Sequence, residues 1–279
     1  MKRIGLIGLG NIGSYYSGKL MDAKYPLTVL DVNKEKQDCI VKMGAVAAKS
    51  LTDIVLNSDI IILSLPNSEV VENIMDCKDG ILASIKEGQL IIDTSTCRPS
   101  TAIKYDKLCS EKKAGFIDSP LTWRGAAGQI LMVGGSDENF AKGEEILKCL
   151  SYKYRHVGPS GCGQYLKMIN QAILANQLAV NCEAVEMSKK CQLDPKLLGE
   201  FLEFNIPEAL YTEKYEGGGH LVLHYKDLGY LLEIAHDVGA SIPISSIVHE
   251  IFKATKLYGE PNWFQLGIQT YYKRLNSGE

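Results

Sequence analysis

Glycines recur at Gly8, Gly10 and Gly13, directly after an apolar run and directly before a helical pattern. In a strand–turn–helix, the first glycine of Gly-x-Gly-x-x-Gly permits a tight turn, the second lets the backbone approach a pyrophosphate, and the third allows close helix packing. The helix start, at Asn11 and Ile12, directs free N–H groups and a positive dipole end at the phosphates. The segment therefore predicts a dinucleotide-binding turn; the alternative is a glycine turn that holds no ligand.

An acidic residue, Asp31, ends the next predicted strand at the distance expected for such a turn. A carboxylate there would accept hydrogen bonds from the adenosine ribose hydroxyls and would repel a 2′-phosphate. No arginine follows immediately, although Lys34 and Lys36 lie close by. We therefore expect NAD as the cofactor, with NADP as the alternative.

Lys167 and Asn170 lie three residues apart in a long helical pattern and so project from the same face. A lysine in an otherwise apolar, buried helix is costly unless it has partners or a lowered pKa. A lysine tuned in this way can give a proton to an alkoxide, or take one from a hydroxyl, as a hydride is transferred. The alternative is a side chain that extends to solvent from a helix end.

The elements that must position these residues fall into two parts. Short apolar runs alternate with helical patterns over the first ~160 residues, which predicts βαβ units and a parallel sheet. The expected strands are 4–8, 27–31, 59–65, 89–93, 115–118 and 130–133. Beyond them the sequence is helical almost throughout, starting with a long helix over 163–191. We expect an α/β fold, with a Rossmann-type doubly wound parallel sheet over 1–161 and an all-α domain over 162–279, joined by that long interdomain helix.

The composition is that of a globular protein, with 279 residues, 46% of them hydrophobic and 23% charged. A net charge of −3 gives no general basic surface for nucleic acid, and no apolar run reaches the ~20 residues of a membrane-spanning helix. Eight cysteines without a Cys-x-x-Cys pair indicate neither a zinc site nor a disulfide framework. We expect a cytoplasmic protein without nucleic-acid or membrane partners.

His220 and His224 have the i, i+4 spacing of some metal-ligand pairs. No general-base glutamate lies beside them, and no third ligand is well placed. We therefore expect no metal site, and interpret both histidines as surface or interface residues.

Four further segments occur in an order that matches a known family. They are Asp93-Thr94-Ser95-Thr96, Asp118-Ser119-Pro120-Leu121-Thr122, the run from Gly161 to Asn170, and Lys226-Asp227-Leu228. With the glycine turn, they make the chain resemble the β-hydroxyacid dehydrogenases, the group of 3-hydroxyisobutyrate dehydrogenase and tartronate semialdehyde reductase. The resemblance runs from residue 3 to about residue 272.

This resemblance implies an oxidoreductase that transfers a hydride between NAD(P) and a small β-hydroxyacid or its semialdehyde. It implies that Lys167 is the catalytic acid/base and that Ser95 and Asn170 bind the substrate. The implied cofactor contacts are Leu65, Pro66, Val70, Thr96 and Lys226. Two alternatives stay open: Ser95-Thr96 could cap the next helix, and Lys226-Asp227 could be a solvated surface pair.

The sequence departs from the family after Leu121, where members typically continue Ser-Gly-Gly and this chain has Thr122-Trp123-Arg124. Trp123 and Arg124 cannot copy the close backbone approach of glycine. The guanidinium of Arg124 could instead hold a small anionic substrate, with Thr122 beside it. The alternative is that Arg124 points to solvent or to a neighbouring subunit.

The long helix is apolar around most of its circumference, which predicts burial between domains or between subunits. We therefore expect a homodimer or homotetramer. Two other functions remain as alternatives: a non-catalytic dinucleotide-binding sensor or scaffold, and an imine reductase on the same fold. The presence of Lys167 at the acid/base position argues against both.

Overall fold

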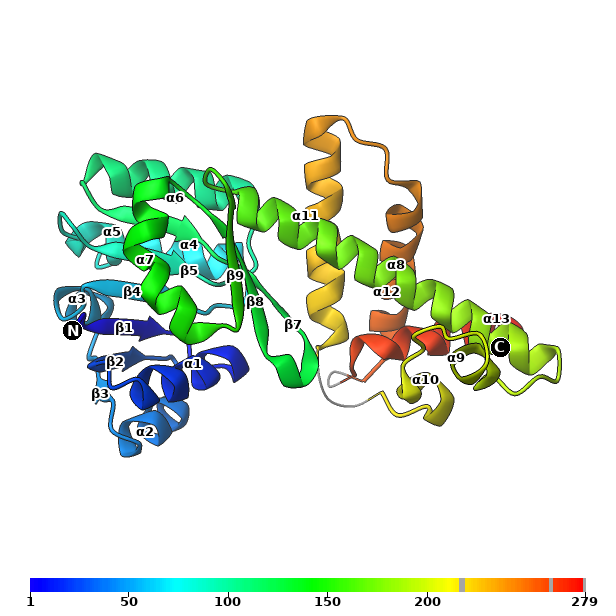
Figure 1. Ribbon diagram of the computed structural model, residues 1–279. Helices are drawn as coiled ribbons and strands as arrows, with labels where there is room; N and C mark the ends of the chain where they lie inside the picture. The colour runs from blue at the N-terminus through cyan, green and yellow to red at the C-terminus, as the bar shows by residue number, and fades with distance from the viewer. Residues whose placement is uncertain (216–218, 261–262, 278–279) are drawn as a thin grey trace. The chain divides into compact units, whose positions relative to one another are not determined.

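Figure 1 shows the computed structural model, which describes residues 1–215, 219–260 and 263–277. The chain divides into two compact units, Met1–Lys167 and Met168–Glu279. Helix α8 (Cys162–Lys190) begins where we expected the second domain to begin, and it runs through the division between the units. The boundary at residue 161 stays a prediction.

A nine-stranded sheet forms the centre of the first unit. Six strands are parallel, in the order β3 (Val46–Ala47), β2 (Leu27–Leu30), β1 (Ile4–Ile7), β4 (Ile60–Leu63), β5 (Leu90–Asp93) and β6 (Gly115–Asp118). This order is that of the classical dinucleotide-binding fold, whose strand order reverses between β1 and β4. The predicted Rossmann-type sheet is therefore confirmed.

The sheet continues beyond β6 in a way that the sequence did not predict. β8 (Gln129–Gly134) is antiparallel to β6 and to β7 (Leu121–Trp123), and β9 (Lys153–Gly158) lies parallel beside β8. A short turn containing the 3₁₀ helix η1 (Gly125–Ala127) joins β7 to β8, and such a short connection can link only antiparallel strands. The strand expected at 130–133 is present as β8, but it runs antiparallel to β6, so the run of parallel strands ends at β6.

Helices cover both faces of the sheet, and two hydrophobic cores lie between helices and strands (Figure 1). Ile60 and Ile62 point into one core and Ile61 and Leu63 into the other, as successive strand residues do. The first core takes side chains from α1 (Asn11–Asp22), α2 (Lys34–Lys42) and α7 (Asp137–Leu150). The second takes them from α3 (Leu51–Leu56), α4 (Ser68–Asp76), α5 (Ile81–Ser84) and α6 (Pro99–Glu111).

The second unit is helical, as predicted. Its further elements are α9 (Leu197–Glu200), α10 (Glu208–Thr212), α11 (Leu221–Val238), α12 (Pro243–Tyr258), η2 (Gln265–Ile268) and α13 (Gln269–Ser277). They enclose a core around Phe252, Leu228 and Ile268, all fully buried. Within the described ranges, no helix of either unit has both the length and the apolar character to cross a lipid bilayer.

Candidate active site

The parallel register brings the carboxyl ends of the central strands to one edge of the sheet. Ile7 pairs with Leu30 and with Leu63, Leu63 pairs with Asp93, and Asp93 pairs with Asp118. The segments that leave these ends carry most of the predicted site residues of the first unit. The sheet therefore brings the glycine turn, Asp31 and the segments after β4 and β5 together, at the edge where open α/β sheets bind ligands.

The three glycines of the turn differ in what surrounds them. A Cβ on Gly8, whose φ is +93°, would lie 2.2 Å from the Ser64 carbonyl oxygen, and a Cβ on Gly13 would lie 1.9 Å from the Gly8 oxygen. A Cβ on Gly10 would meet nothing within 4 Å. Gly8 and Gly13 are therefore required by packing, whereas Gly10 faces open space at the start of α1.

The start of α1 has the properties of an anion site. Gly10 is the N-cap and supplies no side-chain cap, and the first turn, from Asn11, holds no acidic residue. The N–H groups at this end therefore lack a side-chain acceptor from the cap, and the positive end of the helix dipole faces the same open space. These features fit the pyrophosphate of a dinucleotide.

Asp31 braces the glycine turn from the end of β2. Its Oδ2 accepts a hydrogen bond from the Leu9 N–H at 2.5 Å, and its Oδ1 accepts one from the Asn33 N–H at 2.6 Å. Each carboxylate oxygen can accept more than one hydrogen bond. Asp31 can therefore hold the turn and also accept from a ribose hydroxyl. The nearby Lys34 ammonium forms an ion pair with Asp38 on the same helix, with 3.6 Å between Lys34 Nζ and Asp38 Oδ1.

The segments after β4 and β5 are bonded to each other. The Leu65 N–H donates to Ser95 Oγ at 2.9 Å, and the Ser95 N–H donates to Asp93 Oδ1 at 2.9 Å. Val70 lies in the first turn of α4, where its N–H donates to the cap Asn67. Leu65 and Val70 are half-buried.

The alternative in which Ser95-Thr96 caps the next helix is wrong. Helix α6 begins only at Pro99, with Arg98 at the N-cap, so Ser95 and Thr96 lie before the cap position. Thr96 is half-buried, and Pro66 is exposed at the same edge.

A buried carboxylate, Asp118, anchors the start of α8, and sequence reasoning did not identify this role. Its Oδ1 accepts from the Gly161 N–H at 2.8 Å and its Oδ2 from the Gln164 N–H at 2.9 Å. A Cβ on Gly134 or Gly163 would lie 2.4 or 2.7 Å from these oxygens, so both glycines make room for the carboxylate. Burial raises the pKa of Asp118 to about 6.

Asp93 lies beside Asp118 in the sheet register and is also fully buried. Burial raises the pKa of Asp93 to about 7, and the neighbouring charge of Asp118 acts in the same direction. Two aspartates at the ends of adjacent parallel strands are visible in the sequence. That pattern could have indicated a buried carboxylate pair at the site.

Gln164 connects α8 to the segment after β5. Its Nε2 donates to the Ser95 carbonyl oxygen at 2.8 Å and its Oε1 accepts from the Cys97 N–H at 3.0 Å. Lys167 lies one helical turn further on the same face and is 8% exposed. The structure therefore places Lys167 on the face of α8 that is fixed to the Ser95 segment, and Asn170 follows one turn later.

The divergent residues after β6 form the hairpin β7–β8 at the edge of the sheet. Thr122 is buried, whereas Trp123 and Arg124 are exposed. The Trp123 ring contacts the ring of Tyr15 on α1 edge to face, with 5.4 Å between centroids. The hairpin is thereby fixed to the helix that follows the glycine turn, and the Arg124 N–H closes its turn by donating to the Gly128 oxygen.

Lys226 and Asp227 of the second unit are not a solvated surface pair. Asp227 is buried and accepts a hydrogen bond from Gln171 Nε2 of α8 at 2.7 Å. The Lys226 ammonium lies 3.2 Å from Asp227 Oδ1 and 5.1 Å from the ring centroid of Tyr230. Lys226 is therefore held by the buried Asp227 carboxylate and by the face of the Tyr230 ring. The alternative of a solvated surface pair is wrong.

The two histidines considered as metal ligands have different surroundings. His220 is the N-cap residue of α11, and the ring of the buried His224 stacks on Phe252 at 5.9 Å. Over residues 1–215, 219–260 and 263–277, no three His, Cys, Asp or Glu side chains cluster as metal ligands. The interpretation of His224 as a surface or interface residue is wrong, because it is buried within the second unit against Phe252.

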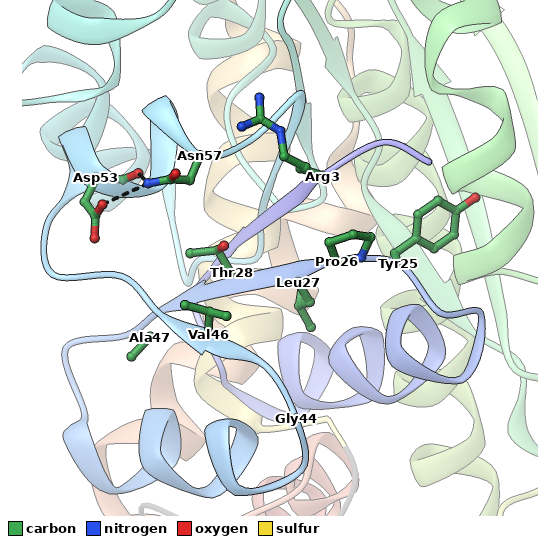
Figure 2. A pocket seen from close by; sticks show the side chains of 10 residues that line it. All are labelled: Arg3, Tyr25, Pro26, Leu27, Thr28, Gly44, Val46, Ala47, Asp53 and Asn57. Atoms are coloured by element: carbon green, nitrogen blue, oxygen red, sulfur yellow. Dashed lines mark hydrogen bonds between the residues drawn. The ribbon is translucent and has the colours of Figure 1, made fainter.

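A pocket of about 400 Å³ lies elsewhere in the first unit. Figure 2 shows side chains around it, including Arg3 before β1, Leu27 and Thr28 of β2, Asp53 of α3 and Asn57 at the C-cap of α3. These residues lie at the amino ends of the strands or beside them. The pocket is therefore at the opposite edge of the sheet from the glycine turn and is separate from the candidate active site.

Comparison with known proteins matches both units. Residues 3–158 match the model of the NAD-binding domain of 6-phosphogluconate dehydrogenase, and residues 161–263 match that of the NAD-binding region of NADP-dependent 3-hydroxyisobutyrate dehydrogenase. The chain is 30% identical to 2-(hydroxymethyl)glutarate dehydrogenase of Eubacterium barkeri, over 92% of this chain and 90% of that one.

The chain is also 32% identical to the NAD-dependent L-serine dehydrogenase of Pseudomonas aeruginosa, over 91% of this chain and 92% of that one. The structure of Mycobacterium tuberculosis 3-hydroxyisobutyrate dehydrogenase with L-serine has the same fold, with a TM-score of 0.89 at 23% identity and coverage of 98% and 99% of the two chains. The predicted family is confirmed: the chain belongs to the NAD(P)-dependent β-hydroxyacid dehydrogenases related to 3-hydroxyisobutyrate dehydrogenase.

Proposed function

We propose that this dehydrogenase oxidises a small hydroxyacid reversibly to its semialdehyde or oxoacid, with Lys167 as the acid/base. The observation that carries the proposal is the buried Lys167, one turn beyond a glutamine that is bonded to the Ser95 segment. That segment leaves the same sheet edge as the glycine turn. A buried lysine at a dinucleotide-binding edge has the chemistry needed to exchange a proton with a hydroxyl group.

The chain's own groups have distinct roles in this proposal. NAD(P), when bound, would supply the hydride acceptor for oxidation of the hydroxyl-bearing carbon and the hydride donor for the reverse reaction. Lys167 takes the proton from the hydroxyl oxygen during oxidation and gives it back during reduction. Ser95 and Asn170 hold the acid group of the substrate, Asp93 fixes the Ser95 backbone, and the start of α1 binds the pyrophosphate.

NAD is the proposed cofactor in preference to NADP. Asp31 directly follows β2, and both of its oxygens lie within 2.6 Å of backbone N–H groups, which holds its carboxylate beside the glycine turn. We expect the adenosine ribose to bind at this carboxylate. Its charge would repel a 2′-phosphate. The remaining proposed cofactor contacts are Leu65, Pro66, Val70, Thr96 and Lys226.

The divergent hairpin supports an anionic substrate. Arg124 is exposed at the tip of β7–β8, and the Trp123–Tyr15 contact fixes this hairpin beside α1. A guanidinium there would hold a carboxylate, sulfonate or phosphate in two parallel hydrogen bonds. Thr122, buried beside it, is the second proposed substrate contact.

A second copy of the chain is the proposed partner. Ile173, Val180 and Met187 recur every seven residues on α8 and are each more than half exposed. An apolar stripe of this kind on a long helix fits association with another helix, which is the basis for a homodimer or homotetramer. The cytoplasm remains the proposed location.

The test measures NAD and NADP reduction by absorbance across a panel of carboxylated, sulfonated and phosphorylated hydroxyacids. We expect Lys167→Ala to abolish turnover while the exposed control Lys112→Ala retains it, and Arg124→Ala to raise KM for the anionic substrate. Turnover by Lys167→Ala at the wild-type rate would refute the acid/base assignment. If the protein binds a dinucleotide but reduces it with no hydroxyacid of the panel, a non-catalytic sensor is favoured. Activity on cyclic imines alone would favour an imine reductase.

A further inference from the structure

We propose that Gln164 is a positioning residue that sets Lys167 against the substrate-binding segment 95–97. The proposal rests on the acid/base role proposed for Lys167. It assigns a function to a side chain that is fully buried. Its basis is a set of buried hydrogen bonds that attach the first turn of α8 to the end of β6 and to the loop after β5.

Gln164 uses both heteroatoms of its amide at once. Nε2 donates to the Ser95 carbonyl oxygen at 2.8 Å, and Oε1 accepts from the Cys97 N–H at 3.0 Å. The side chain is fully buried, so neither bond competes with bulk water. The amide thereby bonds the backbone on both sides of Thr96 and fixes the conformation of this segment.

The backbone of Gln164 is fixed as well. Its N–H donates to Asp118 Oδ2 at 2.9 Å, and the other oxygen of the same carboxylate accepts from the Gly161 N–H at 2.8 Å. The first turn of α8 is therefore attached to the end of β6 through its backbone and to the loop after β5 through a side chain. Two attachments in different directions resist both rotation and sliding of the helix.

Lys167 follows Gln164 by three residues, which is a rotation of about 300° and a rise of about 4.5 Å. The two side chains therefore lie on one face, so a displacement of the first turn is transmitted to Lys167. A misplacement of about 1 Å in a reacting group can cost about 100-fold in rate. The Gln164 bonds hold Ser95 and Lys167 at a fixed separation, which proton transfer to a bound substrate requires.

The geometry needs a neutral amide, because one atom must donate and the other must accept. Methionine has similar size and neither capability. Glutamate resembles the amide only when protonated, because an ionised carboxylate cannot donate to the Ser95 oxygen and would add charge beside Asp118. A pH-dependent loss of activity in Gln164→Glu is therefore specific to this role.

Gln89 provides a matched control. It is buried in the same unit, at the amino end of β5, and makes three bonds: its Nε2 donates to the Val55 and Ser58 oxygens and its Oε1 accepts from the Lys86 N–H, each at 2.7 Å. Gln89→Met removes three buried hydrogen bonds at the opposite edge of the sheet, one more than the two that Gln164→Met removes. It should lower thermal stability as Gln164→Met does, without moving Lys167.

The experiment compares kcat, KM for NAD and thermal midpoint for the wild type, Gln164→Met, Gln164→Glu and Gln89→Met. We expect Gln164→Met to lose about 100-fold in kcat with KM for NAD little changed, and Gln89→Met to keep wild-type kcat per folded molecule. The ratio of Gln164→Glu to wild-type kcat should be highest at low pH and fall as the introduced carboxyl ionises. A Gln164→Met kcat within twofold of wild type, or a ratio that is flat with pH, would overturn the proposal.

Parallel measurement of Lys167→Ala separates the two proposals. If that variant turns over normally, the acid/base assignment fails; if it is inactive while Gln164→Met keeps full kcat, only the positioning role fails. A second readout does not depend on turnover: the rate at which an amine-reactive reagent labels Lys167, followed by peptide mass spectrometry. We expect a several-fold change in Gln164→Met and none in Gln89→Met, and an unchanged rate in both variants would refute the positioning role.

Discussion

Removal of the Asp118 carboxylate should loosen the start of α8 and destabilise the first unit. In Asp118→Ala, the Gly161 and Gln164 N–H groups lose acceptors that now lie at 2.8 and 2.9 Å. A buried donor left without an acceptor costs about 1–3 kcal/mol, and loss of a negative charge at a helix N-terminus costs about 0.3–1 kcal/mol more. With two such donors, we expect the free energy of unfolding to fall by about 2–7 kcal/mol, against a typical total of about 5–15 kcal/mol.

The assay is urea unfolding followed by tryptophan fluorescence in a Trp263→Phe background. The chain has two tryptophans, so Trp123 of the first unit then reports alone. Asp118→Asn keeps one acceptor oxygen and should lose only about 1–3 kcal/mol. Asp59→Asn is the matched control, because Asp59 is half-exposed in an ion pair with Arg3 at 2.7 Å, and such pairs contribute about 0–1 kcal/mol.

The reasoning would be refuted if Asp118→Ala were no less stable than Asp59→Asn. That result would mean that the two N–H groups find other acceptors and that the carboxylate does not anchor the helix. An unfolding curve with an unchanged midpoint but a changed slope would instead indicate an altered unfolded or native state.

Two further predictions concern the same sheet edge. Asp31→Ser should lower the preference for NAD over NADP by about 5–30-fold, since one or two hydrogen bonds and a repulsive charge are lost; an unchanged ratio of kcat/KM values for the two cofactors would contradict it. Burial raises the pKa of Asp93 to about 7, so its contribution to stability is complete below about pH 4 and is lost as pH rises through 7. The unfolding free energy of the wild type relative to Asp93→Asn should therefore fall by about 2–3 kcal/mol between pH 5 and 8, and a difference independent of pH would show that Asp93 does not titrate there.

The central fold could be predicted because its signals are local. Apolar runs such as 60–63 indicate strands buried on both faces, and the glycine spacing after β1 identifies the turn without tertiary information. β3 and β9 were missed for the opposite reason. Val46–Ala47 has two residues, and Lys153–Gly158 is a largely polar strand at half-exposed positions, so neither produces an apolar signal.

The residues of the site also divide into those with a local sequence signal and those without one. Lys167 is conspicuous because a cation in an apolar helix needs an explanation, but Gln164 one turn earlier resembles any polar helical residue. Its partners, Ser95 and Cys97, are 69 and 67 residues away, and Asp118 is 46 residues from the N–H that it accepts. Only the strand register shows that these positions meet, so no local pattern could have identified the hydrogen bonds between them.

This division explains which part of the site can change without loss of the chemistry. The groups that fix Lys167 are buried, mutually bonded and shaped by glycines, so a substitution at Asp118 or Gln164 leaves polar atoms without partners. The residues that depart from the family, Trp123 and Arg124, are exposed on a hairpin, where new side chains need satisfy no buried partner. A change of substrate in this chain would therefore be accommodated at the hairpin, while the proton-transfer apparatus stays constrained by its hydrogen bonds.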